Sequence, residues 1–105
     1  MVKRGEVWRT TFPDGKDRPG VVVSPAVRNR EGENVILVGC TSQRTDTIYP
    51  NEVKLSGLKL PVETKAQADY LFTIKQARLK EPLTQLTTVH LRELNRALLI
   101  SLGLN

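Results

Sequence analysis

Two short polar segments carry the side chains best suited to chemistry in this sequence. Arg18-Pro19 precedes one apolar run, and Thr41-Ser42-Gln43-Arg44 follows another. If the two runs are neighbouring antiparallel strands, the start of one lies beside the end of the next, and Arg18 comes near Thr41 and Ser42. A guanidinium offers several donors to phosphate oxygens, and a hydroxyl adds one more. We therefore expect a phosphate-binding site here; the alternative is a solvated arginine beside an ordinary strand-end threonine.

Groups that titrate near neutral pH or bind metals are scarce in this chain. Cys40 is the only cysteine and His90 the only histidine. One thiol cannot form an internal disulfide, and one Cys with one His does not make a zinc cluster. We therefore expect no metal and no cofactor. Cys40 is expected to pack as a small apolar side chain in a buried strand, and His90 to lie at the surface.

The charge balance favours an anionic partner. The 105 residues include 16 Lys plus Arg and 11 Asp plus Glu, a formal net charge of +5. Such a balance is typical of proteins that bind nucleic acid, an acidic protein segment or a phosphorylated small molecule, although many inert domains share it.

Length and hydropathy set the overall class. A chain of 105 residues predicts one domain over residues 1–105. The apolar runs Gly20–Val23 and Val35–Val38 are far shorter than the roughly 20 residues of a membrane span. No secretory signal is recognisable after Met1, so we expect a cytoplasmic protein without a membrane segment.

The elements that must position these residues are mainly strands. Apolar, β-branched and alternating segments predict five strands, over residues 5–12, 20–24, 34–41, 50–55 and 66–74. A polar loop over 13–18 and a polar connector over 26–33 separate the first three, and residues 75–79 could form a short helix. Thr87-Thr88 offers an N-cap, and leucines recur at helical spacing up to Gly103. We predict a mainly β protein, a small antiparallel barrel or curled sheet closed by one C-terminal helix.

A series of segments resembles the MazF/PemK toxins in order and spacing. The segments are Lys3–Trp8, Arg18–Pro25 with Asn29 after it, Cys40–Gln43, Tyr49–Leu55, Lys65–Ala68 and the Leu-rich C-terminal helix. The resemblance covers nearly the whole chain. It implies an SH3-like antiparallel barrel with a C-terminal α-helix, as in CcdB and MazF, and a homodimer.

The resemblance also implies an activity. Members of this family are metal-independent endoribonucleases of type II toxin–antitoxin systems that cut single-stranded RNA and so inhibit translation. The substrate's 2′-hydroxyl attacks the adjacent phosphorus and leaves a 2′,3′-cyclic phosphate and a 5′-hydroxyl end. A protein whose nucleophile comes from the RNA must mainly align that group and stabilise charge on the phosphorus. The second partner implied is an antitoxin with an acidic, flexible segment.

Site residues follow from the same resemblance. The family's catalytic Arg and Thr fall on Arg18 and Thr41. The residues expected to contact RNA are Lys16, Arg28, Ser42, Gln43 and Arg44. Further basic residues that could track phosphates are Lys3, Arg4, Arg9 and Arg30. Trp8, Tyr70 and Phe72 are expected in the core or an interface, with base stacking as the alternative.

Two departures from the family pattern leave alternatives open. The loop before Arg18, residues 13–17, is shorter than usual, and Asp69–Phe72 stands where the family carries an acidic-Gln-Ile-Arg segment. Both changes bear on how RNA is covered and which sequence is cut. The alternatives are a non-catalytic toxin-fold protein that binds gyrase, as CcdB does, and a degenerate member that binds RNA or antitoxin without cutting.

Overall fold

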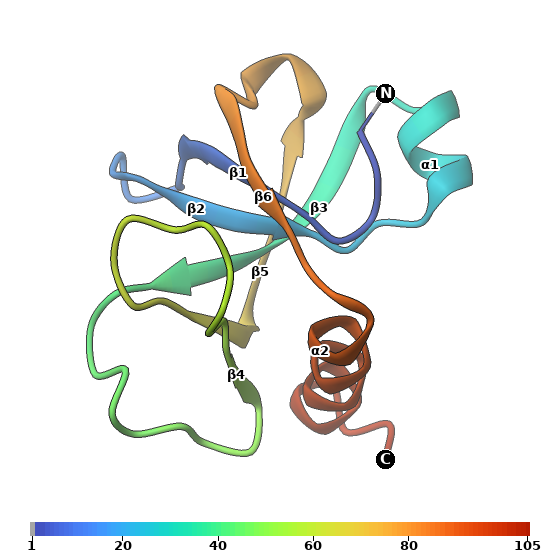
Figure 1. The fold of residues 1–105 in the computed structure, drawn as a ribbon. Coiled ribbons are helices and arrows are strands. Elements are labelled where there is room, and N and C mark those ends of the chain that lie inside the picture. The colour runs from blue at the N-terminus through green and yellow to red at the C-terminus, as the bar shows by residue number, and fades with distance from the viewer. Residues whose placement is uncertain (1) are drawn as a thin grey trace.

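The chain folds into one antiparallel sheet with a helix at its C-terminus (Figure 1). The computed structural model describes residues 2–105. The strands are β1 (Glu6–Thr11), β2 (Asp17–Val22), β3 (Asn34–Thr41), β4 (Glu52–Lys54), β5 (Lys65–Lys75) and β6 (Glu81–Gln85). The helices are α1 (Ala26–Glu31), a 3-10 turn η1 (Gln76–Arg78) and α2 (Thr88–Ser101). The predicted mainly β class with a C-terminal helix is confirmed.

The six strands lie in the order β4-β5-β3-β2-β1-β6, and every neighbouring pair is antiparallel. The register of β3 against β5 shifts between Val38 and Cys40, and the end of β5 that pairs with Cys40 and Thr41 pairs with β4 on its other side. Such irregularities bend a strand and increase its twist, which lets the sheet curl toward a barrel. β4 and β6 remain the two edges of the sheet.

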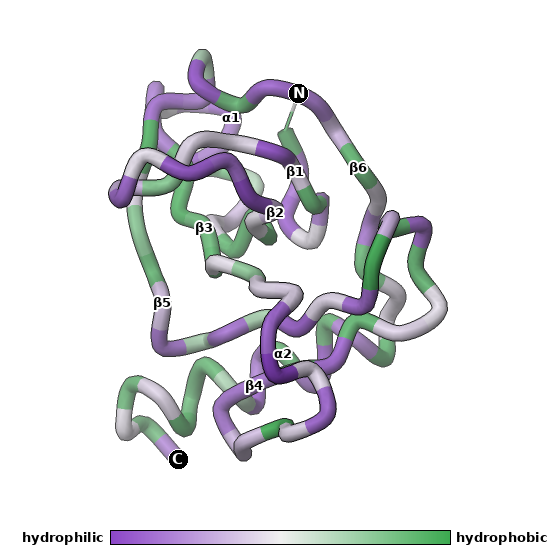
Figure 2. Tube along the Cα trace, turned by 90° about the vertical axis from the view of Figure 1, so that its left-hand side faces the viewer, coloured by the Kyte–Doolittle hydropathy of each residue, from purple (hydrophilic) through white to green (hydrophobic). Residues whose placement is uncertain are grey.

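Apolar side chains cover both faces of the central strand β3. Val38 and Cys40 belong to an inner core that includes Leu94 and Ala97 of α2. Val35 and Leu37 point the other way into a second cluster, against which Trp8 and Phe72 pack. β3 is accordingly a hydrophobic stretch of the trace in Figure 2.

The C-terminal helix begins and ends as the sequence predicts. The Thr87 hydroxyl accepts a hydrogen bond from the backbone N–H of His90, so Thr87 is the N-cap of α2. Gly103 follows the helix with a φ of +68°, a left-handed conformation that glycine adopts without strain. His90 is half-buried, with its ring beside the Thr87 hydroxyl. No helix in residues 2–105 is long and apolar enough to cross a membrane.

Three elements differ from the prediction. β2 begins at Asp17 rather than Gly20, so Arg18 lies in the strand and not in the predicted loop, because its backbone pairs with Thr10 of β1. Residues 26–31, predicted as part of a connector, form α1, which has no apolar periodicity and is instead held by the buried amide of Asn29 on Ser24. β6 was not predicted, because Pro82 in a five-residue segment argues against a strand. At a sheet edge that proline is tolerated, since its missing N–H can face outward. The short helix expected after Lys75 is confirmed as η1.

Candidate active site

A cavity of about 720 Å³ opens where β2 and β3 separate. Their pairing ends at Gly20 and Gly39. Beyond that point β2 continues beside β1, and β3 continues beside β5. Arg18 and Thr41 therefore stand on two diverging strands, and both line the cavity between them.

Five of the seven residues predicted for catalysis or RNA contact line this cavity. Lys16, Ser42 and Gln43 line it together with Arg18 and Thr41. Arg44 follows directly in the same loop and is exposed, with a left-handed φ of 51°. The expected neighbourhood of Arg18, Thr41 and Ser42 is thus observed.

Arg18 is held at the cavity by an aromatic ring and a carboxylate. Its Nη2 lies 2.8 Å from Asp14 Oδ2, and its guanidinium carbon lies 5.5 Å from the centre of the Phe12 ring. The backbone N–H of Lys16, with Arg18 adding to it, keeps the pKa of Asp14 below its ordinary value. The Arg18 side chain is 31% exposed, so a phosphate oxygen can reach it by displacing Asp14.

Thr41 is placed so that its hydroxyl can donate. Its Oγ1 accepts a hydrogen bond of 3.1 Å from the backbone N–H of Gln43. This contact satisfies one lone pair and leaves the hydroxyl proton free to point at a ligand oxygen. Donor groups of Arg18 and Thr41, from two different strands, therefore line the same cavity.

The carboxylates in the cavity wall are paired with cations. Arg9 binds Asp17 Oδ2 through Nη1 and Glu81 Oε1 through Nε, each at 2.7 Å. Lys80 contacts Asp17 at 2.8 Å, and with the Thr11 hydroxyl it keeps the pKa of Asp17 below its ordinary value. Because both wall carboxylates have a cation in contact, their charge does little to repel a phosphate.

Cys40 lines the cavity as an unreactive thiol. It is buried among apolar side chains, and this burial raises the pKa of its thiol to about 12. At neutral pH the thiol is therefore protonated and is a poor nucleophile. The expectation that Cys40 packs in a buried strand is confirmed.

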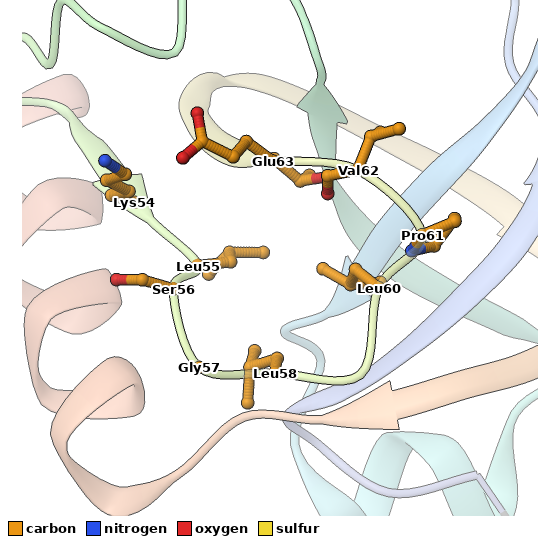
Figure 3. A pocket seen from close by; sticks show the side chains of 10 residues that line it. Lys54, Leu55, Ser56, Gly57, Leu58, Leu60, Pro61, Val62 and Glu63 are labelled. Atoms are coloured by element: carbon orange, nitrogen blue, oxygen red, sulfur yellow. The ribbon is translucent and has the colours of Figure 1, made fainter.

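Sequence reasoning missed one wall of the cavity. Pro61, Val62 and Thr64, from the loop between β4 and β5, line it, together with Gln67 of β5 and with Glu81 and Leu83 of β6. Figure 3 shows Leu55, Leu58 and Leu60 in the interior of that loop, where a smaller cavity of about 270 Å³ lies. Leu58 and Leu60 pack against the inner core, which anchors the loop and places Pro61 and Val62 at the site. Gln67 lies in the segment Lys65–Ala68, which was one of the segments that carried the family resemblance. The β4–β5 loop has no recognisable motif, so no sequence signal could have placed it at the cavity.

Four candidate residues lie outside the cavity. Arg28 is on α1, which leads into the opposite end of β3, roughly 20 Å from Thr41 by strand length. Trp8 is half-buried against the second cluster, which contains Val35 and Leu37, and its indole N–H donates to Glu6 Oε1. Tyr70 and Phe72 pack with Phe12, their ring centres 4.7–5.5 Å apart.

This aromatic cluster depends on a glycine. A Cβ at Gly39 would lie 2.9 Å from a Phe12 ring atom and 3.1 Å from the Tyr70 ring. The missing side chain thus lets Phe12 sit against the sheet, and Phe12 in turn supports the Arg18 guanidinium. Tyr70 and Phe72 are therefore part of the packing behind Arg18.

Fold and site together define a small curled-sheet protein with a cavity lined by Arg18 and Thr41 at one end of its sheet. Residues 3–102 match the family described as PemK-like, MazF-like toxin of type II toxin-antitoxin system. An endoribonuclease MazF9 of Mycobacterium tuberculosis is 33% identical over 116 residues, covering 99% of this chain and 98% of the relative. The chain therefore belongs to the PemK/MazF-like toxins.

Solved structures agree with this assignment. An endoribonuclease in complex with its cognate antitoxin, from a mycobacterial species, superposes with a TM-score of 0.88 at 28% identity and covers 100% of this chain and 98% of its own. A MazE-MazF structure from Deinococcus radiodurans has a TM-score of 0.79 at 25% identity, with coverage of 100% and 98%.

Proposed function

We propose that this protein is an endoribonuclease that cuts single-stranded RNA without a metal or cofactor, as the toxin of a toxin–antitoxin pair. The observation that carries the proposal is the convergence of Arg18 and Thr41 on one cavity, with Lys16, Ser42 and Gln43 around them. These groups bind and stabilise a phosphate, and none of them needs to act as a nucleophile. The relatives named as endoribonucleases match the chain over its whole length.

The proposed reaction takes its nucleophile from the RNA. The 2′-oxygen bonds to the adjacent phosphorus, the bond from phosphorus to the 5′-oxygen breaks, and the 5′-oxygen takes up a proton. The proton of the 2′-hydroxyl passes to solvent. Arg18 stabilises the added negative charge on the phosphorane oxygens, and Thr41 donates a hydrogen bond to the same phosphate. Arg18 acts through the charge and the N–H donors of its guanidinium.

The proposed partners follow from charge and shape. The net charge of +5 suits RNA and also suits an acidic, flexible antitoxin segment that competes with RNA for the cavity. A homodimer is proposed as well, because Leu99, Leu102 and Leu104 leave apolar surface at the C-terminal end of α2, where they are 44%, 56% and 69% exposed. The proposed compartment is the cytoplasm, where RNA and antitoxin are both met.

The test is cleavage of a long unstructured RNA in the presence of EDTA, with the new 5′ ends mapped. Discrete cuts that bear 5′-hydroxyls are expected. Arg18→Ala is expected to lower kcat by about 10²- to 10³-fold, the usual cost of removing one donor that stabilises a transition-state anion. RNA that stays intact at high protein concentration contradicts the proposal. If that RNA is nevertheless bound, the protein is instead a non-cutting member of the family.

A further inference from the structure

Lys65 is a buried cation next to the site. Its side chain is 3% exposed, and its Nζ donates to Glu52 Oε1 and to the backbone carbonyl of Thr47, each at 2.9 Å. The Tyr49 ring lies over the ammonium, with its centre 5.8 Å away. Glu52 is 7% exposed and also accepts a 3.0 Å bond from the Tyr49 backbone N–H. Both charges are therefore enclosed and hydrogen-bonded.

Lys65 contacts both ends of the loop formed by residues 41–47, which lies beside the cavity. Its backbone pairs with Thr41 across β3 and β5. Its side chain reaches Thr47, where the loop turns toward β4. The segment between these two points carries Ser42, Gln43 and Arg44, so a single residue closes the part of the loop that faces the cavity.

The loop needs such a closure because its own contacts are few and strained. Within it, the Gln43 N–H bonds Thr41 Oγ1, and the Thr47 N–H bonds the Arg44 carbonyl at a long 3.3 Å. Arg44 has a φ of 51°, which is unfavourable for a side chain that is not glycine. A conformation of this kind persists only when surrounding contacts hold it.

The ammonium of Lys65 supplies directed hydrogen bonds that an apolar side chain would not. A buried ion pair is no stronger for stability than well-packed apolar residues of similar volume. Its ammonium, however, makes directed hydrogen bonds to the Thr47 carbonyl and the Glu52 carboxylate at once. That geometry selects one loop conformation.

We propose that Lys65, paired with Glu52, is a positioning residue that holds the 41–47 loop and thereby places Thr41, Ser42 and Gln43 around the scissile phosphate. Its catalytic consequence rests on the proposed ribonuclease function, whereas its effect on loop order does not.

The test uses the double variant Lys65→Met with Glu52→Gln, because Lys65→Met alone leaves a buried carboxylate unpaired and destabilises the fold. Lys75→Met is the matched control: Lys75 lies on the same strand, is exposed and pairs with Asn34 at the far end of β3. The first readout is trypsin cleavage after Arg44, quantified by mass spectrometry. Loss of the anchor is expected to speed this cut about tenfold, since proteolysis follows the population of open conformers. The control is expected to match the wild type.

The second readout is steady-state RNA cleavage. The double variant is expected to lose about 10- to 100-fold in kcat with KM within about threefold, because misplaced groups affect the transition state more than binding. An Arg44 cut and a kcat both at wild-type level would overturn the positioning role. A wild-type protein that cuts no RNA would defeat the proposed function, and the trypsin readout would then decide the loop anchor alone.

Discussion

Arg18 forms an ion pair with Asp14. In the proposed reaction, binding of the RNA phosphate to Arg18 would therefore exchange one anion for another. The pair is exposed, and exposed pairs contribute little, yet the carboxylate competes with phosphate for the same donors. We expect Asp14→Asn to lower the KM for RNA by about two- to fivefold with kcat nearly unchanged. Initial rates over a range of RNA concentrations measure both constants. A higher KM would mean that Asp14 instead orients Arg18 for the phosphate.

Cys40 tests whether a thiol takes part in the chemistry. Because burial raises the pKa of Cys40 to about 12, almost no thiolate exists at pH 8. We expect the folded protein to react with a thiol reagent such as DTNB far more slowly than the urea-unfolded chain. Cleavage by Cys40→Ala should stay within about threefold of wild type, provided that the smaller side chain keeps the fold. A large loss of kcat in a variant with unchanged stability would implicate the sulfur.

At the scale of elements, the loops that build the site are attached by different forces. The β4–β5 loop rests on leucines that pack against the inner core, and the loop after β3 rests on the buried pair of Lys65 with Glu52. Apolar packing does not depend on pH, whereas an ion pair does. Lowering the pH should therefore destabilise the loop after β3 before it destabilises the β4–β5 loop.

Glu52 allows this difference to be measured. Burial opposes its ionisation, but the Tyr49 N–H and Lys65 outweigh burial and keep its pKa below the ordinary value of 4.5. A carboxyl with a lowered pKa in the folded state stabilises the protein fully above pH 4.5, and this contribution disappears as the pH falls through the lowered value. We expect Glu52→Gln to cost roughly 3 kcal/mol of unfolding free energy at pH 7 and progressively less below pH 4.5.

Urea unfolding of both proteins between pH 3 and pH 7 provides the measurement. If the difference in unfolding free energy between wild type and Glu52→Gln stays constant down to pH 3, the stabilisation by Glu52 does not depend on the charge of its carboxylate. Thr73→Ser, an exposed change on β5 away from the pair, serves as the control.

At the scale of the whole molecule, the protein has a net charge of +5, and the extent of its surface that contacts RNA can be measured. Each phosphate that a cation neutralises steepens the fall of log K with log salt by about 0.7 for single strands. Lys16→Gln is therefore expected to reduce that slope by about 0.7, since Lys16 lines the cavity. Binding of an RNA whose scissile 2′-hydroxyl is replaced by hydrogen, measured over a salt series, gives the slope.

Arg28→Gln in the same assay shows whether the bound RNA extends as far as α1. An equal change of slope would show that RNA extends from the cavity to α1, as the sequence-based assignment of Arg28 requires. An unchanged slope would confine the contact to the end of the sheet that carries Arg18 and Thr41. If Lys16→Gln leaves the slope unchanged, RNA does not use the cavity.

The sequence by itself determined the local elements and which polar side chains stand at the strand ends. Alternation and apolar runs located β1, β3 and the core of β5, and the Thr87 cap with the leucine spacing located α2. The antiparallel rule also placed Arg18 near Thr41. These features depend on residues close in the chain or on the pairing of consecutive strands, so their signals are present in short stretches of sequence.

Only the tertiary structure decided the rest of the site. β6 exists because β1 offers an edge for it, and Val62 and Leu83 reach the cavity from positions 21 and 42 residues beyond Thr41. The burial of Lys65 could not be read from its neighbours, because a lysine is ordinarily exposed and becomes an anchor only where Glu52 and Thr47 fold over it. Contacts between distant segments depend on register, on the shift between Val38 and Cys40, and on loop paths, and none of these is encoded in a local pattern.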